Sequence, residues 1–95
     1  MEMIMTYELI TPEIAASLLE LGYDKFHLSK SATQLYADIM LAGEWDETTG
    51  AMIVVDEDGM LIDGRHRMAA IVKSKVSIHT WVCRNVPRDE YFKMY

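Results

Sequence analysis

The chain has 95 residues, of which 51% are hydrophobic and 25% charged, the composition of an ordinary globular domain. This length predicts one domain over residues 1–95, because chains divide only beyond about 250 residues. The sequence lacks both the run of about 18 apolar residues that spans a membrane and the basic N-terminal region of a secretory signal. Cys83 is the single cysteine, which excludes an intrachain disulfide and suits a cytoplasmic protein.

Charge is distributed unevenly along the chain. Residues 1–63 hold thirteen acidic and two basic side chains, net −11, whereas residues 64–95 hold seven basic and two acidic ones, net +5. This asymmetry predicts either a local basic surface on a protein of net charge −6 or two halves that neutralise each other. The overall acidity argues against a protein that coats nucleic acid nonspecifically, since phosphate contacts supply most of that affinity.

The N-terminal part predicts a strand and a helix. Hydrophobic residues alternate with others over residues 3–9, which indicates a strand. Thr11 then supplies an N-cap, Pro12 a first helical residue and Gly22 a stop. The predicted apolar face of this helix holds Ile14, Leu18 and Leu21.

A second helix is predicted after a linker over residues 23–28. Ser31 and Gln34 have the spacing of a capping box, in which two side chains bond the free N–H groups of the first turn. Gly43 is the expected C-cap. The predicted apolar stripe holds Ala32, Leu35, Tyr36, Ile39 and Met40.

The C-terminal half predicts three strands and two helices. Short strands over residues 51–55 and 60–62 flank an acidic turn that ends at Gly59. A helix then opens at residues 63–64, a strand follows over residues 76–84, and a short helix closes the chain. The predicted core face of the first of these helices holds Met68, Ile71 and Val72. The predicted fold class is α+β, a small mixed sheet with three to four packed helices.

The junction between strand and helix is the candidate binding site. Asp63 is the expected N-cap, and Gly64, Arg65, His66 and Arg67 follow in or beside the first turn. A helix N-terminus carries about +0.5 charge and disfavours cations by roughly 0.3–1 kcal/mol each. The arrangement therefore predicts a phosphate held by backbone N–H groups and arginine side chains. Alternatively, the arginines pair with acidic side chains at residues 44–47 or 56–58, and His66 is a buried polar tie.

Residues 54–70 resemble the core of the ParB N-terminal/sulfiredoxin-like superfamily, in which a strand, a turn and a Gly-x-[His/Arg]-Arg box open a helix. Residues 29–45 resemble the helix, glycine and tryptophan that precede this core in small members encoded by phages and mobile elements. Residues 11–15 resemble the opening helix, and the resemblance covers about residues 9–86. It implies a protein of the bacterial host cytoplasm, with ATP or CTP and Mg as candidate cofactors. The implied phosphate contacts are Gly64, Arg65, His66 and Arg67.

The chain departs from the pattern of that superfamily at three places. Sulfiredoxins carry their catalytic cysteine where this chain has Arg65, and Cys83 lies in a predicted strand, so sulfinic-acid repair is not expected. ParB proteins add a helix-turn-helix and a dimerisation segment, whereas this chain ends at Tyr95, so centromere binding is not expected either. Lys75 stands where small members usually have a glycine.

Three functions are compatible with these residues. We favour a binding module for nucleotide or nucleic-acid phosphate, with no catalytic residue. A second is an acidic phage-encoded inhibitor that mimics DNA and blocks a host nucleic-acid enzyme or defence nuclease. Its surface would hold Glu44, Asp46, Glu47, Asp56 and Asp58.

The third function is enzymatic, either a ParB-like nuclease or an ATP-dependent phosphotransferase with Asp63 as base. A nuclease would hold a divalent cation between Asp56, Asp58 and Asp63. An acidic turn explains the first two of these residues more simply. Because the three histidines have no metal-ligand spacing, we assign no metal site; they are His27, His66 and His79.

Overall fold

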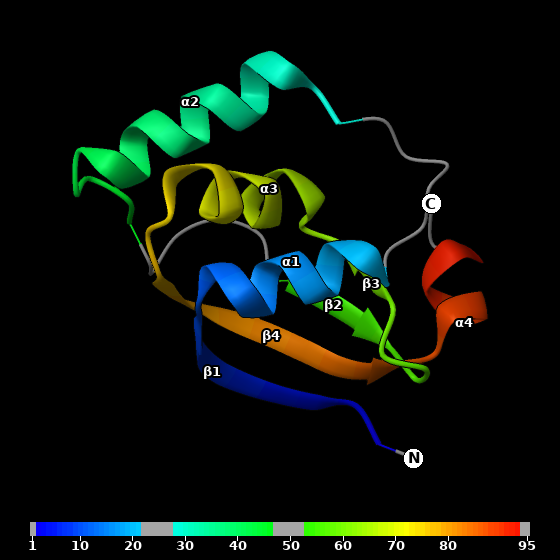
Figure 1. Cartoon of the computed structure of the whole chain (residues 1–95). Helices are drawn as coiled ribbons and strands as arrows, with labels where there is room; N and C mark the ends of the chain where they lie inside the picture. Colours follow the sequence, from blue (N-terminus) through cyan, green and yellow to red (C-terminus); the bar gives the residue numbers. More distant parts are fainter. Residues whose placement is uncertain (1, 22–27, 47–52, 94–95) are drawn as a thin grey trace.

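The computed structural model describes residues 2–21, 28–46 and 53–93, which form an α+β domain (Figure 1). Four strands make one sheet in the order β1-β4-β2-β3. The sheet is mixed, because β1 and β3 pair antiparallel with their neighbours and β2 runs parallel to β4. The predicted fold class is confirmed at this level. In chain order the elements are β1 Ile4–Ile10, α1 Pro12–Glu20, α2 Lys30–Leu41, β2 Ile53–Asp56, β3 Leu61–Asp63, α3 Arg65–Ser74, β4 Ile78–Val86 and α4 Arg88–Lys93.

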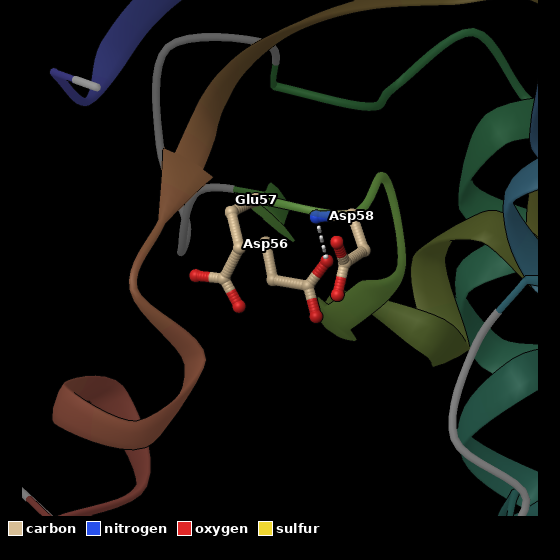
Figure 2. A group of neighbouring side chains, drawn as sticks. All are labelled: Asp56, Glu57 and Asp58. Atoms are coloured by element: carbon tan, nitrogen blue, oxygen red, sulfur yellow. Dashed lines mark hydrogen bonds between the residues drawn. The ribbon is translucent and has the colours of Figure 1, made fainter.

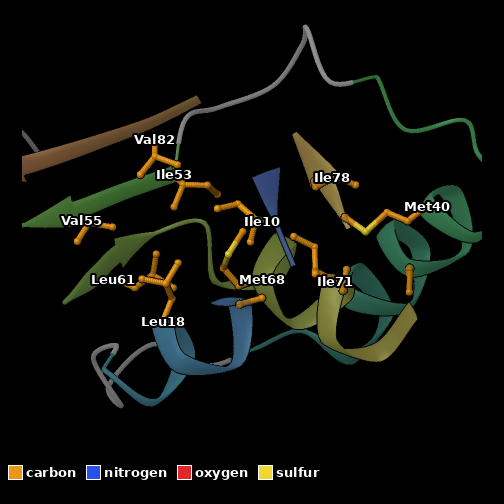
Figure 3. Packing of buried hydrophobic residues seen from close by; sticks show 13 residues of the cluster. Ile10, Leu18, Met40, Ile53, Val55, Leu61, Met68, Ile71, Ile78 and Val82 are labelled. Atoms are coloured by element: carbon orange, nitrogen blue, oxygen red, sulfur yellow. The ribbon is translucent and has the colours of Figure 1, made fainter. Parts of the chain in front are cut away.

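The main core lies between one face of the sheet and the helices. Helices α1 and α3 lie over this face, and α2 packs against α3 from the outside (Figure 1). On the opposite face Val54, Ile62 and Val86 form a smaller buried cluster, against which Tyr91 of α4 packs. The residues of the main core include Ile10, Leu18, Met40, Ile53, Val55, Leu61, Met68, Ile71, Ile78 and Val82 (Figure 3).

The predicted first strand is confirmed as β1, and it lies at an edge of the sheet. It pairs with β4 without a break from Ile4 opposite Arg84 to Ile10 opposite Ile78. Because successive side chains of a strand point to opposite faces, Ile10 is buried in the core, whereas Tyr7 and Leu9 lie on the other face and are nearly half exposed. The pattern of the sequence therefore identified the strand, and the tertiary structure determined which of its faces is buried.

Helix α1 is confirmed, although its buried face differs from the prediction. The Thr11 hydroxyl caps it by accepting the N–H of Ile14 at 3.2 Å. Leu18 is buried as predicted, whereas Ile14 and Leu21 are 41% and 52% exposed. These two side chains line an open hollow beside Arg84 instead of reaching the core.

Helix α2 is also confirmed, but it begins earlier than the capping-box spacing predicted. Its N-cap is Ser29, whose hydroxyl accepts the N–H of Ala32. The Ser31 hydroxyl shares a hydrogen bond of 3.1 Å with that of Ser29. Leu35, predicted to lie on the apolar stripe, is 57% exposed. The buried positions are instead Thr33, Ala37 and Met40. The C-cap is Ala42, one residue before the predicted Gly43, and Gly43 follows it in a left-handed conformation.

The two short central strands are confirmed by β2 and β3, although residues 51–52 of the predicted strand lie outside the described residues. Gly59 takes a positive φ of 83° in the turn between them. Helix α3 buries Met68 and Ile71 as predicted, whereas Val72 is 36% exposed. Lys75 follows α3 with φ 60°, a left-handed conformation that favours glycine.

Candidate phosphate-binding site

The first turn of α3 carries no capping side chain. Gly64 is its N-cap, with φ 103° and ψ 17°, and the turn contains no acidic residue. The prediction of Asp63 as N-cap is therefore wrong: Asp63 ends β3, and its carboxylate accepts the Tyr91 hydroxyl at 2.9 Å. Because the N-cap is a glycine, it has no side chain that could accept a hydrogen bond from the first N–H groups of the helix.

The contact between α3 and β2 requires a glycine at this junction. A Cβ atom on Gly64 would lie 2.4 Å from Cδ1 of the buried Ile53 and 3.5 Å from its Cα atom. Both the left-handed backbone and the close contact make any residue with a Cβ atom at this position costly in free energy. The start of α3 is thus pressed against the sheet, with its N–H groups at the carboxyl end of β3.

Arg67 is a half-buried cation in the first turn of α3. Its Nη1 atom donates to the Thr80 hydroxyl at 3.3 Å, and its guanidinium lies 5.7 Å from the ring centroid of Trp45. The ring of Trp45 in turn packs edge-to-face with that of Tyr36, with the ring centroids 5.5 Å apart. Burial lowers the pKa of Arg67, because the charged form loses hydration. A desolvated guanidinium of this kind attracts an anion more strongly than a surface one.

Among the residues described, no carboxylate lies within ion-pair distance of Arg67, and its Nε atom is buried without a hydrogen-bond partner. Buried donors are ordinarily satisfied, so this group retains capacity for an acceptor. The expected alternative, an arginine neutralised by acids of the turn at residues 56–58, does not hold for Arg67. Arg65 is the first residue of α3 and is half-buried.

His66 connects the starts of two helices. Its Nε2 atom accepts the backbone N–H of Ser29 at 2.8 Å, across 37 residues of sequence. The half-buried imidazole therefore fixes the N-cap of α2 against the first turn of α3. This contact corresponds to the polar tie that the alternative interpretation predicted for His66, and it occupies Nε2 within the fold.

The acidic turn after β2 is ion-paired with an arginine that sequence reasoning had not placed there. Figure 2 shows Asp56, Glu57 and Asp58, whose carboxylates lie within 4.8 Å of one another. Arg88 lies 3.2 Å from the carboxylate of Asp56, 3.3 Å from that of Asp58 and 3.8 Å from that of Glu57. The other oxygen of Asp56 accepts the N–H groups of Asp58 and Met60. The cluster is therefore a hydrogen-bonded turn between β2 and β3 that Arg88 links to α4.

The three carboxylates expected to bind a divalent cation are not all together. Asp56 and Asp58 share the turn, whereas Asp63 bonds Tyr91 and is not part of that group. Arg88 already supplies positive charge to the turn. The arrangement therefore gives the nuclease interpretation little support.

The acidic residues assigned to a DNA-mimicking surface have unlike environments. Glu44 and Asp46 are exposed after α2, and Glu47 lies outside the described residues. Asp58 is exposed but ion-paired, and Asp56 is 1% exposed. A buried, ion-paired Asp56 adds little negative potential to the surface.

Comparison with known proteins identified no match: no family model, no curated protein and no solved structure resembles this chain closely enough to be counted. None of the described helices is long and apolar enough to cross a membrane.

Proposed function

We propose that the chain is a phosphate-binding module that holds a nucleotide or nucleic-acid phosphate at the start of α3. The N–H groups of the first turn point towards the phosphate oxygens, and Arg65 and Arg67 supply the positive charge. Gly64 lets the helix begin directly against Ile53 of β2, which fixes the position of these N–H groups. The module works by binding, without a catalytic residue of its own.

The environment of Arg67 is the observation that carries this proposal. Burying a guanidinium is costly unless a counter-charge accompanies it. Asp63 acts on Arg67 through its charge, but none of the described carboxylates lies within ion-pair distance of the guanidinium. A phosphate would supply a direct ion pair and an acceptor for the buried Nε atom together. A stacked Trp45 holds the guanidinium in place and offsets part of its desolvation.

The order of strand, turn, strand, glycine and helix supports a place in the ParB N-terminal/sulfiredoxin-like superfamily. In that superfamily the equivalent box binds ATP or CTP with Mg, which makes these nucleotides the first ligands to test. We accordingly propose a cytoplasmic protein of a phage or mobile element. The resemblance implies a phosphate contact for His66, but the Nε2 atom of His66 accepts the backbone N–H of Ser29 instead.

The test is calorimetric titration of the purified chain with ATP, CTP and a short single-stranded DNA, each with and without Mg²⁺. Arg65→Gln and Arg67→Gln should each weaken ligand binding by about 10- to 100-fold, since charge-assisted hydrogen bonds contribute about 1.5–3 kcal/mol. Lys73→Gln is the matched control, because it removes the same charge from the exposed last turn of the same helix.

Two results would overturn the proposal. One is equal weakening by Lys73→Gln, which would indicate a general electrostatic effect. The other is a large fall in melting temperature for both arginine variants with no ligand bound by the wild type, which would make the arginines structural. Reversal of Glu44 and Asp46 to lysine should leave phosphate binding equal or stronger; loss of a protein partner in that variant would favour the acidic inhibitor.

A further inference from the structure

In the described part of the chain the outer edge of β1 is unpaired, and the strand lacks the proline and the bulge that often protect edge strands. No described strand pairs with that side of β1, and its register with β4 is free of bulges along the full strand. The segment holds neither proline nor glycine. Natural edges are usually blocked by charge, proline, a bulge or a covering segment, because unpaired N–H and C=O groups recruit other strands.

Charge does not protect this edge either. Glu8 is the single charged residue of β1, and Arg84 of β4 binds its carboxylate through two hydrogen bonds of 2.7 and 2.8 Å. The Thr6 hydroxyl also donates to that carboxylate. This intrachain neutralisation lowers the pKa of Glu8 and leaves a strand edge without a net charge.

The same strand carries an exposed apolar row on the sheet face opposite the main core. Met5, Tyr7 and Leu9 are 46–56% exposed. The ring of Tyr7 stacks on that of His79, with the ring centroids 5.5 Å apart, and packs against that of Trp81, with the centroids 5.2 Å apart. The row therefore continues onto β4. Exposed apolar rows of this kind mark contact surfaces in water-soluble domains.

We propose that two copies of the chain associate through β1, with the two outer edges paired antiparallel about a two-fold axis at Tyr7. A two-fold axis perpendicular to the sheet places each residue opposite a residue of the same face. With Tyr7 opposite its own counterpart, Met5 lies opposite Leu9 and Thr6 lies opposite Glu8. The sheets of the two copies then form one continuous sheet joined through the two β1 strands. Each apolar side chain of the row gains an apolar neighbour from the other copy.

Charge and the length of the paired strand together select this register over its neighbours. An axis at Glu8 would place two Glu8 carboxylates directly opposite each other, which is destabilising. An axis at Met5 would place Glu2 opposite Glu8. An axis at Thr6 avoids like charges, but it pairs Glu8 with Ile4 and places Leu9 and Ile10 opposite Met3 and Glu2, which lie outside the strand. The Tyr7 axis pairs the whole of Ile4–Ile10 without a clash of charges.

The helix layer leaves room for the same partner. A hollow of about 340 Å³ lies beside Arg84, whose neighbour on β1 is Ile4. Ile14 and Leu21 of α1 line it and are exposed. A second copy at the β1 edge would bring its own α1 towards these side chains, so that the contact buries apolar surface on both faces of the joined sheet.

The first experiment is the solution mass of the wild-type chain by light scattering over a concentration series. The proposal predicts a dimer of about twice the chain's 10.9 kDa. The second is disulfide trapping in a Cys83→Ser background, which removes the native thiol. Tyr7→Cys should cross-link two chains, since opposite Cα atoms lie about 4.5–5.5 Å apart, within disulfide range. In the matched control Leu9→Cys, the new thiols would be about 13 Å apart along the strands.

We expect about tenfold or more disulfide-linked dimer from Tyr7→Cys than from Leu9→Cys under mild oxidation, because proximity raises the effective thiol concentration. A wild-type chain that stays monomeric at millimolar concentration overturns the proposal, and the edge is then left for a strand of another protein. A dimer in which Leu9→Cys cross-links as well as Tyr7→Cys overturns it too, since that result requires another interface. The mass measurement decides even if a variant does not fold.

Discussion

A methyl group at position 64 would meet the side chain of Ile53, which is fully buried in the core. The change Gly64→Ala therefore combines two costs. The left-handed backbone, with φ 103°, costs about 1–2 kcal/mol for a residue with a Cβ atom. Displacing the Ile53 Cδ1 atom from a contact of 2.4 Å adds about 1–3 kcal/mol of overpacking. We expect a loss of about 2–5 kcal/mol in the free energy of unfolding, a large part of the 5–15 kcal/mol typical of a domain.

Two other glycines separate these costs. Gly43 and Gly59 also have positive φ, 71° and 83°, but a Cβ atom on either would find no atom within 4 Å. Alanine at these positions therefore retains the backbone cost and lacks the overpacking, so each variant should lose about 1–2 kcal/mol. Gly64→Ala should lose more free energy of unfolding than the other two variants. The difference measures the overpacking at the contact between α3 and β2.

The assay is urea unfolding at equilibrium, followed through the fluorescence of Trp45 and Trp81. The midpoint and slope together give the free energy of unfolding for each variant. Equal losses in Gly64→Ala and Gly43→Ala would refute the reasoning, because they would show that the chain relaxes around the added methyl group. A loss of ligand binding without a loss of stability would assign Gly64 to the phosphate site alone.

Two further predictions concern backbone strain and pH. Lys75→Gly should stabilise the chain by about 0.5–1 kcal/mol in the same unfolding assay, because it relieves a left-handed lysine at the cost of unfolded-state entropy, whereas Lys75→Ala should change little. Glu8→Gln should destabilise at pH 7 by about 1 kcal/mol or less, because the ion pair with Arg84 is partly exposed. Arg84 lowers the pKa of Glu8 below its unfolded value, so this stability is present above the unfolded pKa and is lost as pH falls through the folded pKa. A gap between wild type and Glu8→Gln that persisted at the lowest pH would contradict this account.

Local rules of the sequence were sufficient to predict the secondary structure and the fold class. The alternation over residues 3–9 became β1, Thr11 became the cap of α1, and Gly43 follows the C-cap of α2. These features depend on residues a few positions apart, so their effect is the same in most tertiary contexts. The box at residues 63–67 was likewise expected at a helix start, and α3 begins there.

The tertiary structure alone decided which faces are buried and which charges meet. Ile14 and Leu35 match helical periodicity and are nevertheless exposed, because burial depends on where neighbouring elements lie. Arg88 braces the acidic turn from about 30 residues away. Since no local rule gives the position of a partner so distant in sequence, periodicity could not identify it.

The same limit applies to the candidate site. The sequence supplied two arginines, a histidine and a glycine at the start of a helix, but it gave no means of dividing roles among them. Folding brings Ser29 to His66 and Trp45 to Arg67, so that the histidine becomes a structural tie and one arginine a desolvated cation. The residue types are properties of the sequence, whereas hydration and contact distances, which set the energy of a charge, exist only in the folded chain.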